Sequence, residues 1–389
     1  RGKLAESAIL RRLMRRFATA GTRQDLRACV ELFRMAPEKK YGLILFHGFE
    51  EAFKGRSSAG LPAELLEEID KLGGGSIAFA VRQGKREAVA KALARVQDAK
   101  TPLAQREELA AILGEVKQPA ALPVLLEIIQ RKESDSLRKT ALAALQSYNE
   151  DRIGLAVVKL HPSLTGDVRE AAETLLASRK PWSKQLLVAV SAGTIEPGSI
   201  ARDTVKKLLL HRDADIADLV KKHWGDVKGA TTLAMHQEVD RLLGVVRAGT
   251  GNPYPGKKIF TARCASCHTL HGQGGAVGPD LTPYKRDDTA NLLLHIVNPS
   301  AEIREGYENF VIATESGRLL TGIILEKDAR VVVLRAADGQ KIVLPRDDIA
   351  QISAAGASLM PEGLLQGLDD QAVRDLLAYL RSGQPLNDR

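Results

Sequence analysis

The sequence predicts a mainly α protein in two parts, with a helical-repeat solenoid first and a small helical domain last. Three observations support this prediction. Apolar residues recur at helical spacing through most of residues 1–227. A Gly/Pro-rich stretch at Ala248–Gly256 then separates this part from a second part with a different residue pattern. Within the second part, residues 307–352 alternate between apolar and polar side chains, as strands do.

The composition is that of a globular chain and excludes several classes of protein. A chain of 389 residues is longer than a single hydrophobic core usually accommodates, which favours two or three domains. No apolar run approaches the ~20 residues of a membrane-spanning helix, and three cysteines are too few for a disulfide scaffold. No G-x-S-x-G motif or P-loop occurs, and the glycines at 272–275 lack the lysine of a phosphate loop. We expect no transmembrane segment and no hydrolase or nucleotide chemistry.

The net charge of +8 belongs to the first part of the chain. From Gly256 onward there are 15 Lys/Arg and 17 Asp/Glu, so the basic excess precedes that residue. The only dense basic cluster is LRRLMRRF at Leu10–Phe17, and the other basic residues are dispersed along helical patterns. We interpret them as solvated helix faces and predict no nucleic-acid binding. A basic solenoid is compatible with an acidic protein partner.

Four stretches of the first part align with one another. REELAAILG, RKTALAALQ, REAAETLLA and RDTVKKLLL begin at Arg106, Arg138, Arg169 and Arg202, with steps of 32, 31 and 33 residues. A second apolar helix follows each of them, such as AALPVLLEIIQ or DRIGLAVVKL. Two helices per repeat of this length indicate a stacked solenoid. The pattern resembles HEAT-like repeats, for which a scaffold role is the default.

The breaks in these patterns predict the domain boundaries. A long loop is expected around Ser57, and a last helix at Thr231–Arg247 leads into the Gly/Pro-rich boundary. The predicted domains are a repeat domain at 1–227, a connecting helix and linker at 228–255, a small helical domain at 256–306 and 353–389, and a β-rich insertion at 307–352.

Two of the three cysteines occur together as Cys264-Ala-Ser-Cys267-His268. Zinc sites and redox disulfides also use C-x-x-C, but structural zinc needs four ligands, and His271 and His295 are not spaced to complete such a set. The adjacent histidine favours a third interpretation. C-x-x-C-H attaches one c-type haem, with two thioether bonds and a histidine ligand to iron. Cys29 lies in an amphipathic stretch and is expected to be a buried small hydrophobe.

The flanks of this motif resemble class I cytochromes c. Gly278-Pro279-Asp280-Leu281 matches the G-P-x-L that follows the haem motif in that family. The C-terminal LDDQAVRDLLAYLRSG is expected to form a helix capped at Asp369 or Asp370. By the resemblance, it crosses the helix before the motif at a small residue and aromatics, here Gly256, Phe260 and Tyr379. The resemblance also implies that the Pro279 carbonyl accepts the Nδ1 proton of His268 and that Leu281 packs on the porphyrin.

Met360 is the candidate for the sixth iron ligand. It lies in ASLMPEGL ahead of the last helix, where class I cytochromes place their axial methionine. The alternatives are His295 or an open position. A thioether ligand favours reduced iron and suits electron transfer.

The stretch between the two ligand segments is a β-rich block. Turns are expected at Ser316-Gly317, Lys327-Asp328 and Asp338-Gly339, which gives five strands with PRDD as a tight connection before the last. The order resembles a small SH3-like barrel. Its expected role is structural, covering one haem edge or docking the solenoid.

The whole stretch Gly256–Gly383 resembles the PVC-type CxxCH haem-binding domain. The shared motifs, in order, are C-A-S-C-H, G-P-D-L-T, N-P-S at Asn298–Ser300, S-L-M-P-E-G-L and D-L-L-A-Y-L. Members commonly carry helical repeats before this domain, and many carry a propeller resembling sugar dehydrogenases further upstream. The chain begins at Arg1 without a signal pattern, so we expect a processed or excised piece.

These observations predict a mono-haem electron-transfer module on a helical-repeat scaffold, without enzymatic activity of its own. Its expected partner is a dehydrogenase domain or a redox carrier protein. Covalent haem attachment implies a periplasmic or other extracytoplasmic location. Two alternatives are a ligand sensor or redox enzyme with an open sixth position, and a scaffold in which haem only stabilises the small domain.

Overall fold

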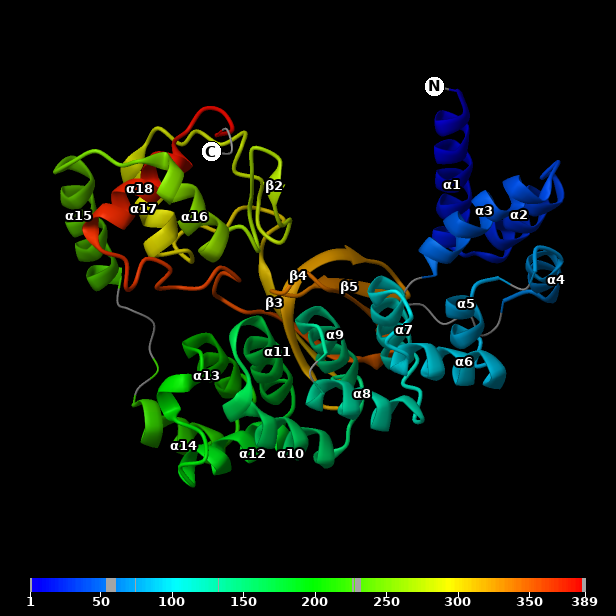
Figure 1. Ribbon diagram of the computed structural model, residues 1–389, viewed down its shortest axis with the longest axis horizontal. Coiled ribbons are helices and arrows are strands. Elements are labelled where there is room, and N and C mark those ends of the chain that lie inside the picture. Colours follow the sequence, from blue (N-terminus) through cyan, green and yellow to red (C-terminus); the bar gives the residue numbers. More distant parts are fainter. Residues whose placement is uncertain are drawn as a thin grey trace. The chain divides into compact units, whose positions relative to one another are not determined.

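The computed structural model describes residues 2–53, 61–73, 75–131, 133–225, 227 and 232–386 (Figure 1). The loop expected around Ser57 lies outside the described residues, as do most of residues 226–231 at the start of the predicted linker. The chain divides into two compact units, Arg1–Leu176 and Ala177–Arg389, which are described separately. The protein is mainly α with a small antiparallel β part near its C-terminus, as predicted.

The first unit is entirely helical over its described residues. Its helices are α1 (Gly2–Ala20), α2 (Arg23–Arg34), α3 (Lys39–Ala52), α4 (Ala63–Lys71), α5 (Ile77–Arg82), α6 (Arg86–Gln97), α7 (Leu103–Glu115), α8 (Ala121–Gln130), α9 (Asp135–Leu145), α10 (Asp151–Leu160), the 3-10 turn η1 (His161–Ser163) and most of α11 (Gly166–Ala177).

The predicted repeat helices are present. The four aligned stretches lie in α7, α9 and α11 of the first unit and in α13 (Arg202–Leu209) of the second, and the expected second helices are α8 and α10. Within the first unit, α9 packs against both α7 and α8. The helical repeats are therefore confirmed, and the HEAT-like character of the repeats stays a prediction.

The aromatic core of the first unit lies among α2, α3 and α5. Phe49 is fully buried, stacks on Phe53 with ring centroids 4.6 Å apart, and meets Phe79 edge-on at 6.0 Å. Cys29 is buried in the same cluster, as predicted for a small hydrophobe. Burial raises the pKa of its thiol to about 12, which keeps the thiol protonated and unreactive.

The regularly spaced arginines bind the ends of preceding segments. Arg106 donates from Nε to Val96 O at 2.8 Å, near the end of α6, and Arg138 donates from Nη2 to Ile129 O at 3.2 Å, near the end of α8. Carbonyls in the last turn of a helix have no partner within the helix and carry partial negative charge. Arg106 and Arg138, 32 residues apart, therefore each supply a donor where a helix end needs one.

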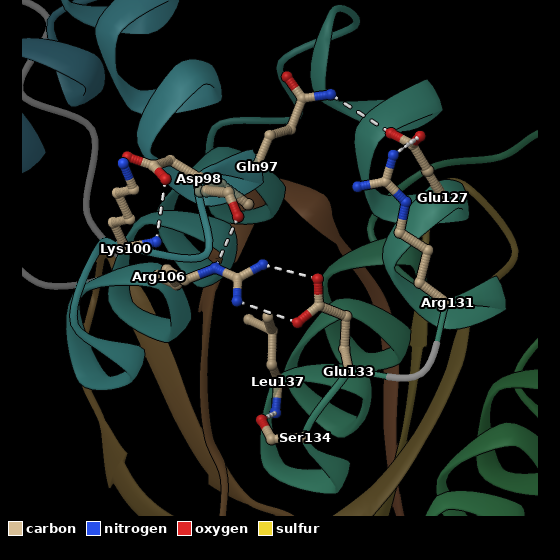
Figure 2. Close-up of polar contacts among 10 residues, drawn as sticks. Gln97, Asp98, Lys100, Arg106, Glu127, Arg131, Glu133, Ser134 and Leu137 are labelled. Carbon is tan, nitrogen blue, oxygen red and sulfur yellow. Dashed lines mark hydrogen bonds and ion pairs between the residues drawn. The ribbon is translucent and has the colours of Figure 1, made fainter.

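Arg106 also forms a two-pronged ion pair with Glu133. Its Nη1 and Nη2 atoms each lie 2.9 Å from a different carboxylate oxygen (Figure 2). The arginine side chain is 6% exposed and that of Glu133 18%, so this pair is far better shielded from water than the Arg131–Glu127 pair beside it, at 53% and 41%. The Arg106 hydrogen bonds hold the pKa of the Glu133 carboxyl below its usual range.

We expect Arg106→Met to destabilise the first unit by about 3 kcal/mol, because the change leaves a shielded carboxylate and a helix-end carbonyl without their donor. Arg131→Met is the matched control and should cost about 0.5 kcal/mol or less, since its ion pair is exposed. Urea unfolding followed by circular dichroism at 222 nm measures both. Equal midpoints for the two variants would contradict the assigned role of Arg106.

The second unit contains further helices and all the strands of the described residues. These are α12 (Lys180–Ser191), η2 (Pro197–Ser199), α13 (Arg202–Leu209), α14 (Ala214–Trp224), α15 (Thr232–Arg247), α16 (Pro253–Arg263), β1 (Thr269–Leu270), β2 (Gln273–Gly274), α17 (Thr289–Val297), β3 (Asn309–Thr314), β4 (Leu319–Lys327), β5 (Val331–Arg335), β6 (Lys341–Pro345), η3 (Arg346–Asp348), β7 (Ile349–Ala354) and α18 (Asp370–Leu380).

The insertion forms the predicted five-stranded antiparallel sheet. The strand order is β6-β5-β4-β3-β7, so the chain meanders through four strands and the last returns beside the first. Figure 1 labels β3, β4 and β5 of this sheet. The PRDD segment supplies the end of β6 and the η3 turn before β7. The SH3-like barrel stays a prediction. Ile312, Val332 and Leu334 form the centre of its core and are fully buried.

The turn between β3 and β4 attaches the sheet to the start of α12. Leu319 N donates to Ser178 O at 2.8 Å, and Arg179 Nη1 donates to Ser316 O at 2.8 Å. Arg179 is 2% exposed, and burial lowers the pKa of its guanidinium to about 10. The sheet is therefore joined by backbone pairing to a repeat helix of the same unit.

Candidate functional site

The C-x-x-C-H segment follows directly from the end of α16. Cys264 N donates to Phe260 O at 2.8 Å, and His268 N donates to Cys264 O at 2.9 Å. The second bond closes a single backbone turn over the motif. Both thiols and the imidazole therefore project from the same turn. A compact turn of this kind is what attachment of one flat ligand through three neighbouring side chains requires.

The helix before the motif crosses the C-terminal helix at Gly256, as the resemblance implied. A Cβ atom at Gly256 would lie 2.0 Å from Asp375 O and 2.9 Å from Tyr379 Cβ, so only glycine permits the contact. Phe260 and Tyr379 pack beside it with ring centroids 5.4 Å apart. Asp375 accepts from Asn252 N at 2.7 Å, at the start of α16. Of the two expected caps of α18, Asp369 and Asp370, it is Asp369 that accepts from Ala372 N, at 2.7 Å.

The imidazole of His268 is held by the loop that follows the motif. Nδ1 lies 3.0 Å from Pro279 O, the contact that the resemblance implied. The carbonyl can only accept, so Nδ1 carries the proton and Nε2 presents its lone pair. Burial lowers the pKa of His268, which favours the neutral form that binds metal. A Cβ at Gly278 would lie 2.6 Å from Cε1 of the ring, so the backbone there covers the imidazole directly.

Two glycines bring the loop back against the motif. A Cβ at Gly274 would lie 2.1 Å from His268 O, and one at Gly275 would lie 2.1 Å from Ser266 O. The backbone therefore approaches closely at both positions, which requires glycine. Leu281 N donates to Thr269 O at 2.8 Å, and the Leu281 side chain is partly buried against the core of the domain.

Both thiols of the motif are free in the structure, and they differ in environment. Burial raises the pKa of Cys264 to about 11. Cys267 Sγ lies 3.9 Å from Ala337 O, in the turn between β5 and β6. Both residues are partly exposed.

Met360 lies in a loop that is hydrogen-bonded to two other segments of the domain. Met360 N donates to Ser358 Oγ at 3.1 Å, and Ser358 N donates to Ser300 Oγ at 3.0 Å. Further along, Arg263 Nη1 donates to the carbonyls of residues 364 and 366 at 2.7 and 2.8 Å. The Met360 side chain is half-buried. The residue just before Cys264 therefore ties the attachment segment to the loop that carries Met360.

The loop also contacts a repeat helix of the same unit. Lys206 in α13 forms an ion pair with Glu362 at 3.2 Å, with both side chains partly shielded. Sequence reasoning missed Lys206, Arg263 and the role of Ser300. Ser300 belongs to the N-P-S motif at Asn298–Ser300, whereas no local signal in the sequence identifies Lys206 or Arg263.

The two other histidines considered as ligands have different surroundings. His271 Nε2 lies 3.1 Å from Ser382 Oγ, after α18. His295 in α17 is 37% exposed and lies 4.0 Å from the Glu302 carboxylate. Across the part of the chain that the structure describes, no group of three or more His, Cys, Asp and Glu residues forms a candidate metal cluster. The zinc alternative therefore finds no donor set there.

A match to a protein family favours the haem interpretation of the C-x-x-C-H segment over zinc or a disulfide. Residues 254–318 match the family model for cytochrome c. This segment is a cytochrome c domain. The matched residues run from α16 through the C-x-x-C-H turn to the β3–β4 turn, and Met360 lies beyond them. No curated protein matches the chain.

The domain carries one covalent haem c with its iron and has an electron-transfer role. The residues present fit that cofactor, because two thiols and an imidazole with Nε2 available occupy one turn. In the described residues, no helix is long and apolar enough to cross a bilayer.

Proposed function

We propose that the cytochrome c domain passes single electrons between a dehydrogenase and a redox carrier protein, with the helical repeats as its scaffold. The observation that carries this proposal is the His268 Nδ1–Pro279 O contact, which leaves Nε2 for iron directly beside two thiols. When bound, haem c supplies an iron that alternates between the ferrous and ferric states.

In this proposal the protein side chains would fix the cofactor. Cys264 and Cys267 would hold the porphyrin through two thioether bonds. His268 and Met360 would ligate the iron, with Pro279 orienting His268, and Leu281 would pack on the porphyrin. Protein ligands on both sides of the iron would keep small molecules away from it, which favours electron transfer over ligand chemistry.

We further propose an extracytoplasmic, periplasmic location, because haem is generally attached to thiols outside the cytoplasm. The basic excess of the chain before Gly256 supports an acidic partner. Such a complex should weaken as ionic strength rises. Binding of the natural partner that is independent of salt would contradict this part of the proposal.

The test is an absorption spectrum of oxidised and reduced protein, produced with cytochrome c maturation factors, for the natural chain and for Met360→Ala. We expect low-spin haem c with a far-red methionine-to-iron band that Met360→Ala abolishes. Met35→Ala is the matched control, because Met35 is 75% exposed, and it should keep the band.

Two other outcomes would change the conclusion. An unchanged low-spin spectrum in Met360→Ala would move the sixth ligand to another residue, with His295 first. High-spin haem in the natural chain, with rapid carbon monoxide binding after reduction, would replace electron transfer by the sensor or enzyme interpretation.

A further inference from the structure

The insertion reaches the haem-attachment loop through residues 336–340, here called the β5–β6 turn. Ala336 N donates to Gln340 O at 2.9 Å, and Gly339 N donates to Ala336 O at 2.9 Å. Asp338 also accepts from Gln340 N at 3.0 Å. Gly339 has φ +82°, a left-handed conformation that glycine adopts without strain. The hydrogen bonds give the β5–β6 turn one defined shape.

Three contacts join this turn and its flanking strand to the segment that attaches haem. Ala337 O lies 3.9 Å from Cys267 Sγ. Arg335 Nη1 donates to Ala276 O. A Cβ at Gly339 would lie 3.4 Å from a methyl of Val277, in ordinary van der Waals contact. The contacts fall on both sides of His268 in the sequence, so the turn covers the motif and the loop after it.

The β5–β6 turn and the residue packed beneath it differ in exposure to water. Beneath it, Val277 is only 5% exposed although it belongs to a loop. Ala337, Asp338 and Gly339 themselves are exposed. The turn therefore covers Val277 and lies beside Cys267, with its own residues facing water.

We propose that the β5–β6 turn closes the Cys267 edge of the haem site, so that external redox partners exchange electrons at a part of the porphyrin edge that the turn does not cover. This inference rests on the proposed electron-transfer function and assigns the insertion a part in it. Closing one edge has two physical consequences. It lengthens the approach of an external reductant to Cys267. It also removes water from that edge, which disfavours the ferric state with its extra charge and raises the reduction potential.

The experiment compares two altered chains with a matched control, all loaded with haem c. In the first, Asn-Gly replaces residues 336–340; this two-residue turn keeps the Arg335–Lys341 pairing while removing the Ala337 and Gly339 contacts. The second is Arg335→Ala. The control is Lys341→Ala, because Lys341 is exposed, pairs with Arg335 across the same hairpin and carries the same charge.

The two readouts are the midpoint potential and the rate of reduction by hydroquinone, a neutral reductant whose approach is insensitive to the charge removed. We expect severalfold faster reduction in the short-turn chain and in Arg335→Ala, and a potential lower than that of Lys341→Ala. Unchanged values in both altered chains would overturn the proposal. Slower reduction in the short-turn chain would also overturn it, because the turn would then be the electron route.

These outcomes are separable from failure of the proposed function. If Met360 is not a ligand, the spectrum of Met360→Ala shows it, while the comparison at the turn still reports how far the Cys267 edge is covered. If the function holds and the turn has no effect, the far-red band is present in all the chains and their reduction rates agree.

Discussion

Covalent haem is expected to be absent from the chain in which Cys264 and Cys267 are both replaced by alanine. Both thioether bonds are lost, and the proposed ligands His268 and Met360 can hold the cofactor only reversibly. Haem-dependent peroxidase staining after a denaturing gel should show no band, because denaturation removes haem that is only coordinated. The effect is all or none, which makes it the largest predicted for the site.

The third cysteine provides the control for this result. Cys29 is fully buried in the first unit, far along the sequence from the motif, so Cys29→Ala should keep the full haem stain. A haem stain that persists in the double alanine chain would contradict the assignment of the two thiols and require another attachment residue.

Gly256→Ala should destabilise the cytochrome c domain by about 3 kcal/mol, because the added methyl cannot fit against the backbone of α18 and must push the two helices apart. The same substitution at Gly244, in α15, is the control. A Cβ there meets nothing within 4 Å, so helix propensity alone acts and Gly244→Ala should stabilise by about 1 kcal/mol.

Thermal unfolding followed by the Soret absorbance of the loaded protein measures both glycine variants. The informative quantity is the difference in sign between two identical changes in neighbouring helices. Equal shifts in the same direction would mean that the crossing at Gly256 does not depend on close approach.

The elements that the sequence predicted are those with local signals. Repeat helices, the five strands and the Asp369 cap were predictable because periodicity, turn residues and capping residues act within a few positions. The crossing at Gly256 was predictable only through resemblance to class I cytochromes c, since nothing local pairs that glycine with Tyr379.

The parts that sequence reasoning missed are contacts between distant segments. Arg263 and the carbonyl of residue 364 are 101 positions apart, and Cys267 and Ala337 are 70 apart. Neither contact alters periodicity or composition, so no pattern predicts it. The pairing of Leu319 with Ser178 is another contact between distant segments. Residues of α12–α14 fall in the same compact unit as the cytochrome c domain, whereas repeat periodicity predicted a boundary at residue 227. The predicted domain boundaries stay predictions.

The bond from Asn252 N to Asp375 has a consequence for the order of folding. The acceptor at the start of α16 comes from α18, 123 positions later. During synthesis the C-x-x-C-H segment therefore leaves the ribosome well before the helix that completes its support, and contacts of such long range form slowly. Until α18 arrives, the two thiols lie in a chain without its tertiary packing. The support that α18 gives to the start of α16 is therefore among the last contacts of the domain to form.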